Sequence, residues 1–186
     1  MVQIDFGLAK RYWGKPQVDP GEKETLKMNV QEYVANQTER MTDALAHFVA
    51  TTHADKVQWQ PQVEGSAPTR SALEQAAECV VVNRMIAAGL RGEAPSAPPS
   101  AGPALVLTSS AEAQEQLQAS GAELAAAIRA MADADLERMY QHPRGQFLGA
   151  NLIMMPMRNM AYHAGQINLI QMLAGDPEFH VPPQWR

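Results

Sequence analysis

Three polar side chains that could take part in chemistry share one face of a predicted helix. Asn159, His163 and Gln166 are spaced four and three residues apart. Residues with this spacing lie on the same side of a helix, and here they interrupt a stripe of apolar residues. Burying each of them without a partner would cost about 1–3 kcal/mol. We therefore expect partner side chains, water, a metal or a ligand to satisfy them.

Glu78 is predicted to lie on or beside the inward stripe of an earlier helix. A carboxylate that faces the core of a bundle also needs a partner, and Glu78 can pair with His163 directly or through a divalent cation. Glutamate oxygen and histidine nitrogen suit zinc or another first-row metal, whereas the amide oxygen of Asn159 is a poor ligand for these ions. The structural alternative is a buried His163 that is hydrogen-bonded to Glu78 or to a main-chain carbonyl.

Four amphipathic helices are predicted to position these residues, because apolar residues recur at steps of three and four in four segments. The predicted helices cover residues 24–51, 70–91, 109 or 110 to before His142, and 148–173. The expected inward positions are Leu26, Val30, Val34, Gln37, Met41, Leu45, Phe48, Leu73, Ala77, Val81, Met85, Ala88, Leu117, Gly121, Leu124, Ile128, Met131, Leu152, Met155, Asn159, Tyr162, His163, Gln166, Ile170 and Leu173. Four long helices, two long connections and no convincing strand predict an all-α four-helix bundle.

Local signals mark the ends of these helices. Ser71 and Glu74 match the capping-box pattern at the start of the second helix, and Gly92 is a stop signal at its end. Pro156 is expected to kink the fourth helix, unless the helix begins there with the proline in its first turn. Gly165, in mid-helix, costs about 1 kcal/mol relative to alanine, which a close neighbouring backbone would explain.

The chain divides into three parts. Residues 1–23 show little periodicity and are predicted to form an N-terminal arm, whose aromatic residues favour packing on the body or on a partner subunit. Residues 24–175 form the predicted bundle, with the proline-rich segment 92–103 as a crossing linker between helices. Residues 176–186 are a C-terminal tail.

Composition narrows the classes of function. The 186 residues suit a single domain, and 15 basic against 20 acidic residues give a net charge of −5. This charge argues against binding to nucleic acid or to an anionic membrane surface. Cys79 is the single cysteine, which excludes an internal disulfide and a multi-cysteine metal site. No apolar run of about 20 residues and no secretory signal is present, so we expect a cytoplasmic protein.

The order and spacing of three short motifs resemble those of the DinB/YfiT-like superfamily. The motifs are Trp59-x-Pro61, Ser71-x-x-Glu74-x-x-x-Glu78 and His163-Ala164-Gly165-Gln166, and the match spans about residues 26–175. The resemblance implies a four-helix bundle of up-up-down-down type that commonly forms a homodimer. It also implies a divalent metal, nickel or zinc, held by three histidines, and relatives that act as metal-dependent hydrolases or as thiol transferases.

The three ligand positions of the family fall on Glu78, Asn159 and His163 in this sequence, and only one of them is a histidine. Our first hypothesis is a polar site between the second and fourth helices that binds a small molecule or a divalent metal. His163 would be its general base or ligand, and Glu78 would orient it or bind the same ion. The second hypothesis is a non-catalytic homodimeric binding or scaffold protein that has lost the metal.

Overall fold

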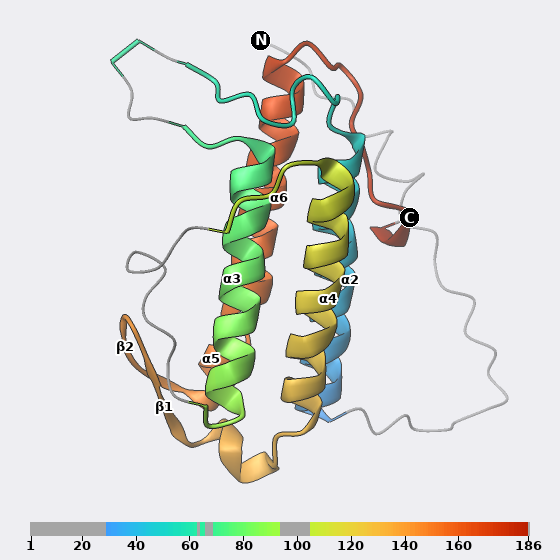
Figure 1. The fold of residues 1–186 in the computed structure, drawn as a ribbon. Helices are drawn as coiled ribbons and strands as arrows, with labels where there is room; N and C mark the ends of the chain where they lie inside the picture. The colour runs from blue at the N-terminus through green and yellow to red at the C-terminus, as the bar shows by residue number, and fades with distance from the viewer. Residues whose placement is uncertain (1–28, 63, 66–68, 94–104, 186) are drawn as a thin grey trace, which may run out of the picture.

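The structure is a computed structural model that describes residues 29–62, 64–65, 69–93 and 105–185. In this part of the chain four long helices pack side by side (Figure 1). The helices are α2 (Val30–Thr51), α3 (Ala72–Leu90), α4 (Ser110–Arg129) and α6 (Met155–Leu173). The predicted all-α four-helix bundle is confirmed. The predicted arm, residues 1–23, lies outside the described residues.

The helix directions follow an up-down-down-up order (Figure 1). Gln171, in the last turn of α6, donates to the carbonyl of Phe48 near the end of α2 at 2.9 Å, so these helices run parallel. Gln31, in the first turn of α2, donates to Asp133 just beyond the end of α4, so α2 and α4 are antiparallel. Bonds between α3 and α4 advance along both helices together, which makes this pair parallel. The up-up-down-down order implied by the resemblance is therefore wrong.

A long connection between α3 and α4 makes this order possible. A helix of the length of α3, 19 residues, is about 28 Å long. The chain between Leu90 and Ser110 can reach further than that when extended, at up to about 3.3–3.6 Å for each residue. Gly92, with a φ of 75°, ends the turn after α3 as predicted. Most of the predicted linker, residues 92–103, lies outside the described residues.

Capping side chains set where α2 and α3 begin. Asn29 accepts a hydrogen bond from the backbone nitrogen of Glu32 at 2.7 Å. This cap starts α2 at the following residue, later than the predicted start near residue 24, because an extended N-cap residue cannot lie inside the helix. Ser71 and Glu74 form the predicted capping box at the start of α3.

A short β-hairpin follows α4, where the sequence predicts no strand. The helix ends at Arg129, and a 3-10 turn (Asp133–Leu136) leads to strands β1 (Met139–His142) and β2 (Gly145–Leu148). The two strands pair antiparallel. Each strand has four residues, which is too short for an alternating pattern to stand out in the sequence.

The last predicted helix is divided in two. A single turn, α5 (Gly149–Leu152), is followed by α6, and Pro156 lies in the first turn of α6. The second of the two options for Pro156 is therefore correct. Proline suits this position because its fixed φ matches the helix and its missing N–H would have no partner there.

The inward faces differ from the prediction at several positions. Tyr162 and Leu173 on α6 are 65% and 56% exposed, and Val30 on α2 is 53% exposed. On α3 the positions Val81, Met85 and Ala88 are half-buried. These residues flank the apolar stripes, and periodicity alone does not fix how far round a helix the contact with its neighbours extends.

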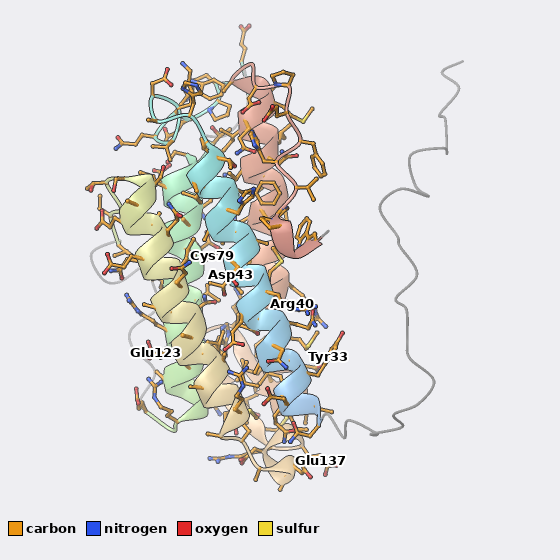
Figure 2. The ribbon with its side chains drawn as sticks, turned by 90° about the vertical axis from the view of Figure 1, so that its right-hand side faces the viewer. Tyr33, Arg40, Asp43, Cys79, Glu123 and Glu137 are labelled. Atoms are coloured by element: carbon orange, nitrogen blue, oxygen red, sulfur yellow. The ribbon has the colours of Figure 1, made fainter. Side chains whose placement is uncertain are left out.

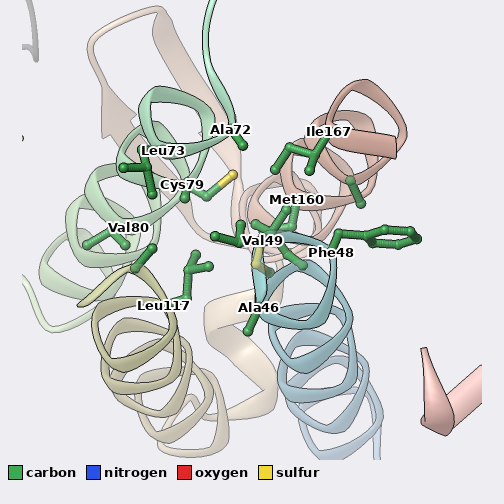
Figure 3. Packing of buried hydrophobic residues seen from close by; sticks show 14 of the residues in the cluster. Ala46, Phe48, Val49, Ala72, Leu73, Cys79, Val80, Leu117, Met160 and Ile167 are labelled. Atoms are coloured by element: carbon green, nitrogen blue, oxygen red, sulfur yellow. The ribbon is translucent and has the colours of Figure 1, made fainter. Parts of the chain in front are cut away.

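The core consists of two apolar clusters stacked along the bundle. Figure 3 shows part of one cluster, where Leu117, Val49, Met160 and Cys79 converge from the four helices. Buried polar side chains of all but one helix lie in the middle of the bundle, at Thr38, Thr42, Asn83 and Ser120. The apolar core is therefore continuous only within each half of the bundle.

A neighbouring helix packs closely against Gly121 but not against Gly165. A Cβ atom at Gly121 would collide with the side chain of Thr42, so glycine lets α4 approach α2 there. At Gly165 no described atom from another element lies within 4 Å of such a Cβ. The neighbour expected to explain Gly165 is therefore not found within the described part of this chain.

The C-terminal tail returns to the bundle. Its final short helix (Pro183–Trp185) places the ring of Trp185 against Phe48 of α2, edge to face, with 6.0 Å between ring centroids. Such a pair contributes about 0.5–1.5 kcal/mol beyond simple burial. The tail is therefore held to the outer side of α2.

Candidate functional site

His163 lies in the interior, where α6 packs antiparallel against the first turns of α3. The residue is 3% exposed. Because α6 ends beside the start of α3, His163 meets Gln75 and Glu78, which are three residues apart and share one face of α3. The structure thus brings together two of the three predicted ligand residues, Glu78 and His163.

Two glutamine side chains fix the orientation of the His163 ring. Its Nδ1 lies 3.1 Å from Oε1 of Gln75 and 2.9 Å from Oε1 of Gln166. The amide of Gln75 is oriented by its own donation from Nε2 to the carbonyl of Arg70. Two acceptor oxygens facing one ring nitrogen require that Nδ1 carries the hydrogen and donates it. Nε2 is therefore the ring nitrogen that is available to bind a ligand or to accept a proton.

Nε2 of His163 faces the carboxylate of Glu78, with 3.4 Å between Nε2 and Oε1. Burial lowers the pKa of His163, the hydrogen bond with Gln166 opposes this, and the charge of Arg70 lowers the pKa further. The ring is therefore mainly neutral near pH 7, and Nε2 presents a lone pair. A lone pair and a carboxylate oxygen at this distance form a pair of acceptors that a hydrogen-bond donor or a cation would bridge.

The carboxylate of Glu78 has a second partner. Its other oxygen, Oε2, forms an ion pair with the guanidinium of Arg70. The side chain of Glu78 is 33% exposed and that of Arg70 is 59% exposed. The pair of acceptors therefore lies at the rim of the bundle, buried on the His163 side and open to solvent on the Arg70 side.

Asn159, the third predicted ligand residue, bonds elsewhere. Its Nδ2 donates to Sγ of Cys79 at 3.5 Å, and within the described residues no bond joins it to Glu78 or His163. Burial raises the pKa of the Cys79 thiol to about 12, against a smaller lowering by the Asn159 bond. Cys79 lies between the helices in Figure 2, whereas Tyr33 and Arg40 lie on the outer side of α2.

Arg70 and Gln75 were not predicted to be residues of the site. Gln75 precedes Glu78 by three residues, so a helical face drawn through Glu78 includes it. Arg70 precedes the Ser71 cap, where the chain has no helical period, and its contact with Glu78 depends on the path of the loop into α3. The position of Gln75 could therefore have been found from its spacing to Glu78, whereas nothing in the sequence indicates the contact of Arg70 with Glu78.

The residues present fit a divalent cation with two donors. Two atoms that bind one tetrahedral zinc ion at about 2.0–2.1 Å lie about 3.3 Å apart, close to the observed separation of 3.4 Å. An imidazole whose other nitrogen donates to an oxygen is the usual arrangement of a metal-binding histidine. The described part of the chain contains no group of three or more His, Cys, Asp or Glu side chains suited to a metal. Further coordination positions would fall to water or to a ligand.

A comparison with protein families places the site in a known fold. The model of the DinB superfamily matches residues 37–167, a span that includes Glu78, Asn159 and His163. No curated protein matches the chain. None of the described helices combines the length and the apolar character needed to cross a bilayer. The matched span covers more than half of the chain and all four long helices in part or whole, and the chain therefore belongs to the DinB superfamily.

Proposed function

We propose that the Glu78–His163 pair binds a divalent cation, nickel or zinc, and presents it to a small-molecule ligand at the rim between α3 and α6. The observation that carries this proposal is the 3.4 Å separation of Nε2 and Oε1, with Nδ1 held as the donor. By resemblance to the superfamily, the reaction class is metal-dependent hydrolysis or thiol transfer, in the cytoplasm. The cation would lower the pKa of a water or thiol nucleophile.

The residues of this chain have separate tasks in the proposed site. Gln75 and Gln166 hold the His163 ring so that Nε2 points at Glu78. The carboxylate of Glu78 supplies an oxygen and negative charge beside it. The exposed side of Glu78 provides the approach for a ligand from solvent. With only two strong donors, we expect binding weaker than at a site of three histidines.

A titration tests this proposal. Calorimetry with Ni²⁺ or Zn²⁺, on protein stripped of metal, should show about one ion per chain. Glu78→Gln and His163→Gln should each weaken binding at least about tenfold, whereas His53→Ala should not, because the side chain of His53 is 83% exposed and distant in sequence from both donors. If the wild-type chain shows neither binding heat nor a rise in melting temperature with either ion, the proposal is wrong.

The second candidate function is a homodimeric binding or scaffold protein. It is favoured by one specific observation, the exposed apolar face of α6, at Tyr162, Leu169 and Met172, which are 65%, 53% and 60% exposed. Large exposed apolar residues that lie close together mark contact surfaces. Dimerisation through this face would leave the buried His163 in place, so the two candidates differ in the metal. A scaffold protein that has lost the metal should bind neither ion in the titration.

A further inference from the structure

Arg70 and His163 approach the same carboxylate from two sides. The guanidinium pairs with Oε2 of Glu78, and Nε2 of His163 lies 3.4 Å from Oε1. We infer that the guanidinium of Arg70 competes with the cation for the negative charge of Glu78, so that Arg70 lowers the affinity of the site for the ion. This inference rests on the proposed function, and it concerns what sets the affinity of that site.

The positive charge of Arg70 opposes the binding of a cation at Glu78. An arginine side chain stays protonated at any physiological pH, so the Arg70–Glu78 pair has no net charge. A divalent cation that approaches Nε2 and Oε1 therefore meets a neutralised carboxylate and a permanently charged guanidinium next to it. Both effects weaken the binding of the cation, and neither would exist if residue 70 were uncharged.

The side chain of Arg70 is free to move away from Glu78. Its backbone is fixed, because the carbonyl oxygen accepts a hydrogen bond from Gln75 Nε2 at 3.3 Å. Its side chain is 59% exposed, and within the described residues it forms an ion pair with no carboxylate other than Glu78. The guanidinium can therefore leave for solvent without breaking other ion pairs and without moving the cap of α3.

Solvent screens the attraction between Arg70 and Glu78. Because both partners of the pair are exposed to solvent in part, their attraction is far weaker than that of a buried pair. Arg70 should thus lower the affinity for the cation without preventing binding. The expected size is about tenfold in the dissociation constant, and it should shrink as the salt concentration rises.

The experiment compares the Ni²⁺ dissociation constants of the full chain and its variants by calorimetry. Arg70→Met should bind Ni²⁺ about tenfold more tightly than the wild type, and Arg70→Gln should behave alike. Arg144→Met makes the same change in net charge in the hairpin, at the opposite end of the bundle, and should leave the affinity unchanged. The double variant Arg70→Met with Glu78→Gln should lose the gain, because the competition is for that carboxylate.

Equal or weaker binding by both Arg70 variants, with melting temperatures showing that they fold, would overturn the inference. If they bind like the wild type while His163→Gln abolishes binding in all of them, the proposed cation site stands and only the role of Arg70 fails. If no variant binds Ni²⁺, the proposed function and the inference fail together. An equal gain in Arg144→Met would show a general effect of net charge and would also overturn the role of Arg70.

Discussion

Cys79 and Asn159 form a buried pair beside the proposed site. The side chain of Cys79 is fully buried, and its thiol accepts the hydrogen bond of Asn159. The side-chain amide of Asn159 therefore has a hydrogen-bond partner that is not a metal. The pair is thus a contact between α6 and α3 that does not involve Glu78 or His163.

We predict that Cys79 does not react with thiol reagents in the folded protein. Burial raises its pKa to about 12, so near pH 8 almost none of it is thiolate, and the thiolate is the reactive form. A colorimetric assay with Ellman's reagent should give no signal in native buffer and one thiol per chain in denaturant, since Cys79 is the single cysteine. Rapid labelling of the native protein, at a rate proportional to reagent, would contradict this.

The contrast between His163 and Arg70 shows what could be predicted about the site. His163 and Glu78 were identified because helical periodicity fixes which positions share a face. The contact between them, and the turn of Asn159 towards Cys79, depend on the relative height of α3 and α6, which no pattern within one helix reveals. Arg70 lies outside the helices, so its contact with Glu78 depends on a loop.

At the scale of the elements, a polar layer links the four helices. Asn83 of α3 donates to Ser120 of α4 at 3.3 Å and to the sulfur of Met160 on α6 at 3.7 Å. Thr42 of α2 donates to the same sulfur at 3.5 Å. These contacts form only when the helices keep one relative height. The layer therefore fixes the register that sets Glu78 opposite His163.

We predict that Asn83→Ala destabilises the protein by about 1–3 kcal/mol. The change removes the bond to Ser120 and leaves a cavity in a fully buried position. Asn83→Leu should cost less, because it fills the space and removes Oδ1, which has no hydrogen-bond partner among the described residues. Urea denaturation gives the free energies of unfolding.

The exposed Gln118→Ala on α4 is the control for that series and should change the free energy by less than about 0.5 kcal/mol. If Asn83→Leu destabilises the protein more than Asn83→Ala, the space at position 83 does not accept a leucine side chain, because both variants lose the same hydrogen bonds. The prediction about Oδ1 would then be wrong.

The number and type of the long helices could be predicted because each carries a continuous apolar period, and the cap at Ser71 was readable from its spacing to Glu74. The directions of the helices could not be predicted. They depend on the long connection before Ser110, which permits a parallel or an antiparallel neighbour, and on contacts such as that of Gln171 with Phe48 at the other end of the bundle.

At the scale of the whole molecule, α6 presents an apolar face with no covering element among the described residues. Tyr162, Leu169, Met172 and Leu173 are exposed on it. Gly165 lies between them, and no described atom from another element comes within 4 Å of the place that a Cβ would occupy there. A glycine costs about 1 kcal/mol in mid-helix. A second copy of the chain packed on this face would account for both the exposed residues and the glycine.

We therefore predict a homodimer through α6. Light scattering after size exclusion should give about 41 kDa, twice the chain mass of 20.3 kDa. Leu169→Glu should give a folded chain of half that mass, because a buried unpaired carboxylate at an interface is costly. Val106→Glu introduces the same charge at a residue that is 72% exposed before α4 and should leave the dimer intact. A wild-type mass equal to that of one chain at all concentrations would contradict the prediction, and an equal effect of both variants would assign the change to charge alone.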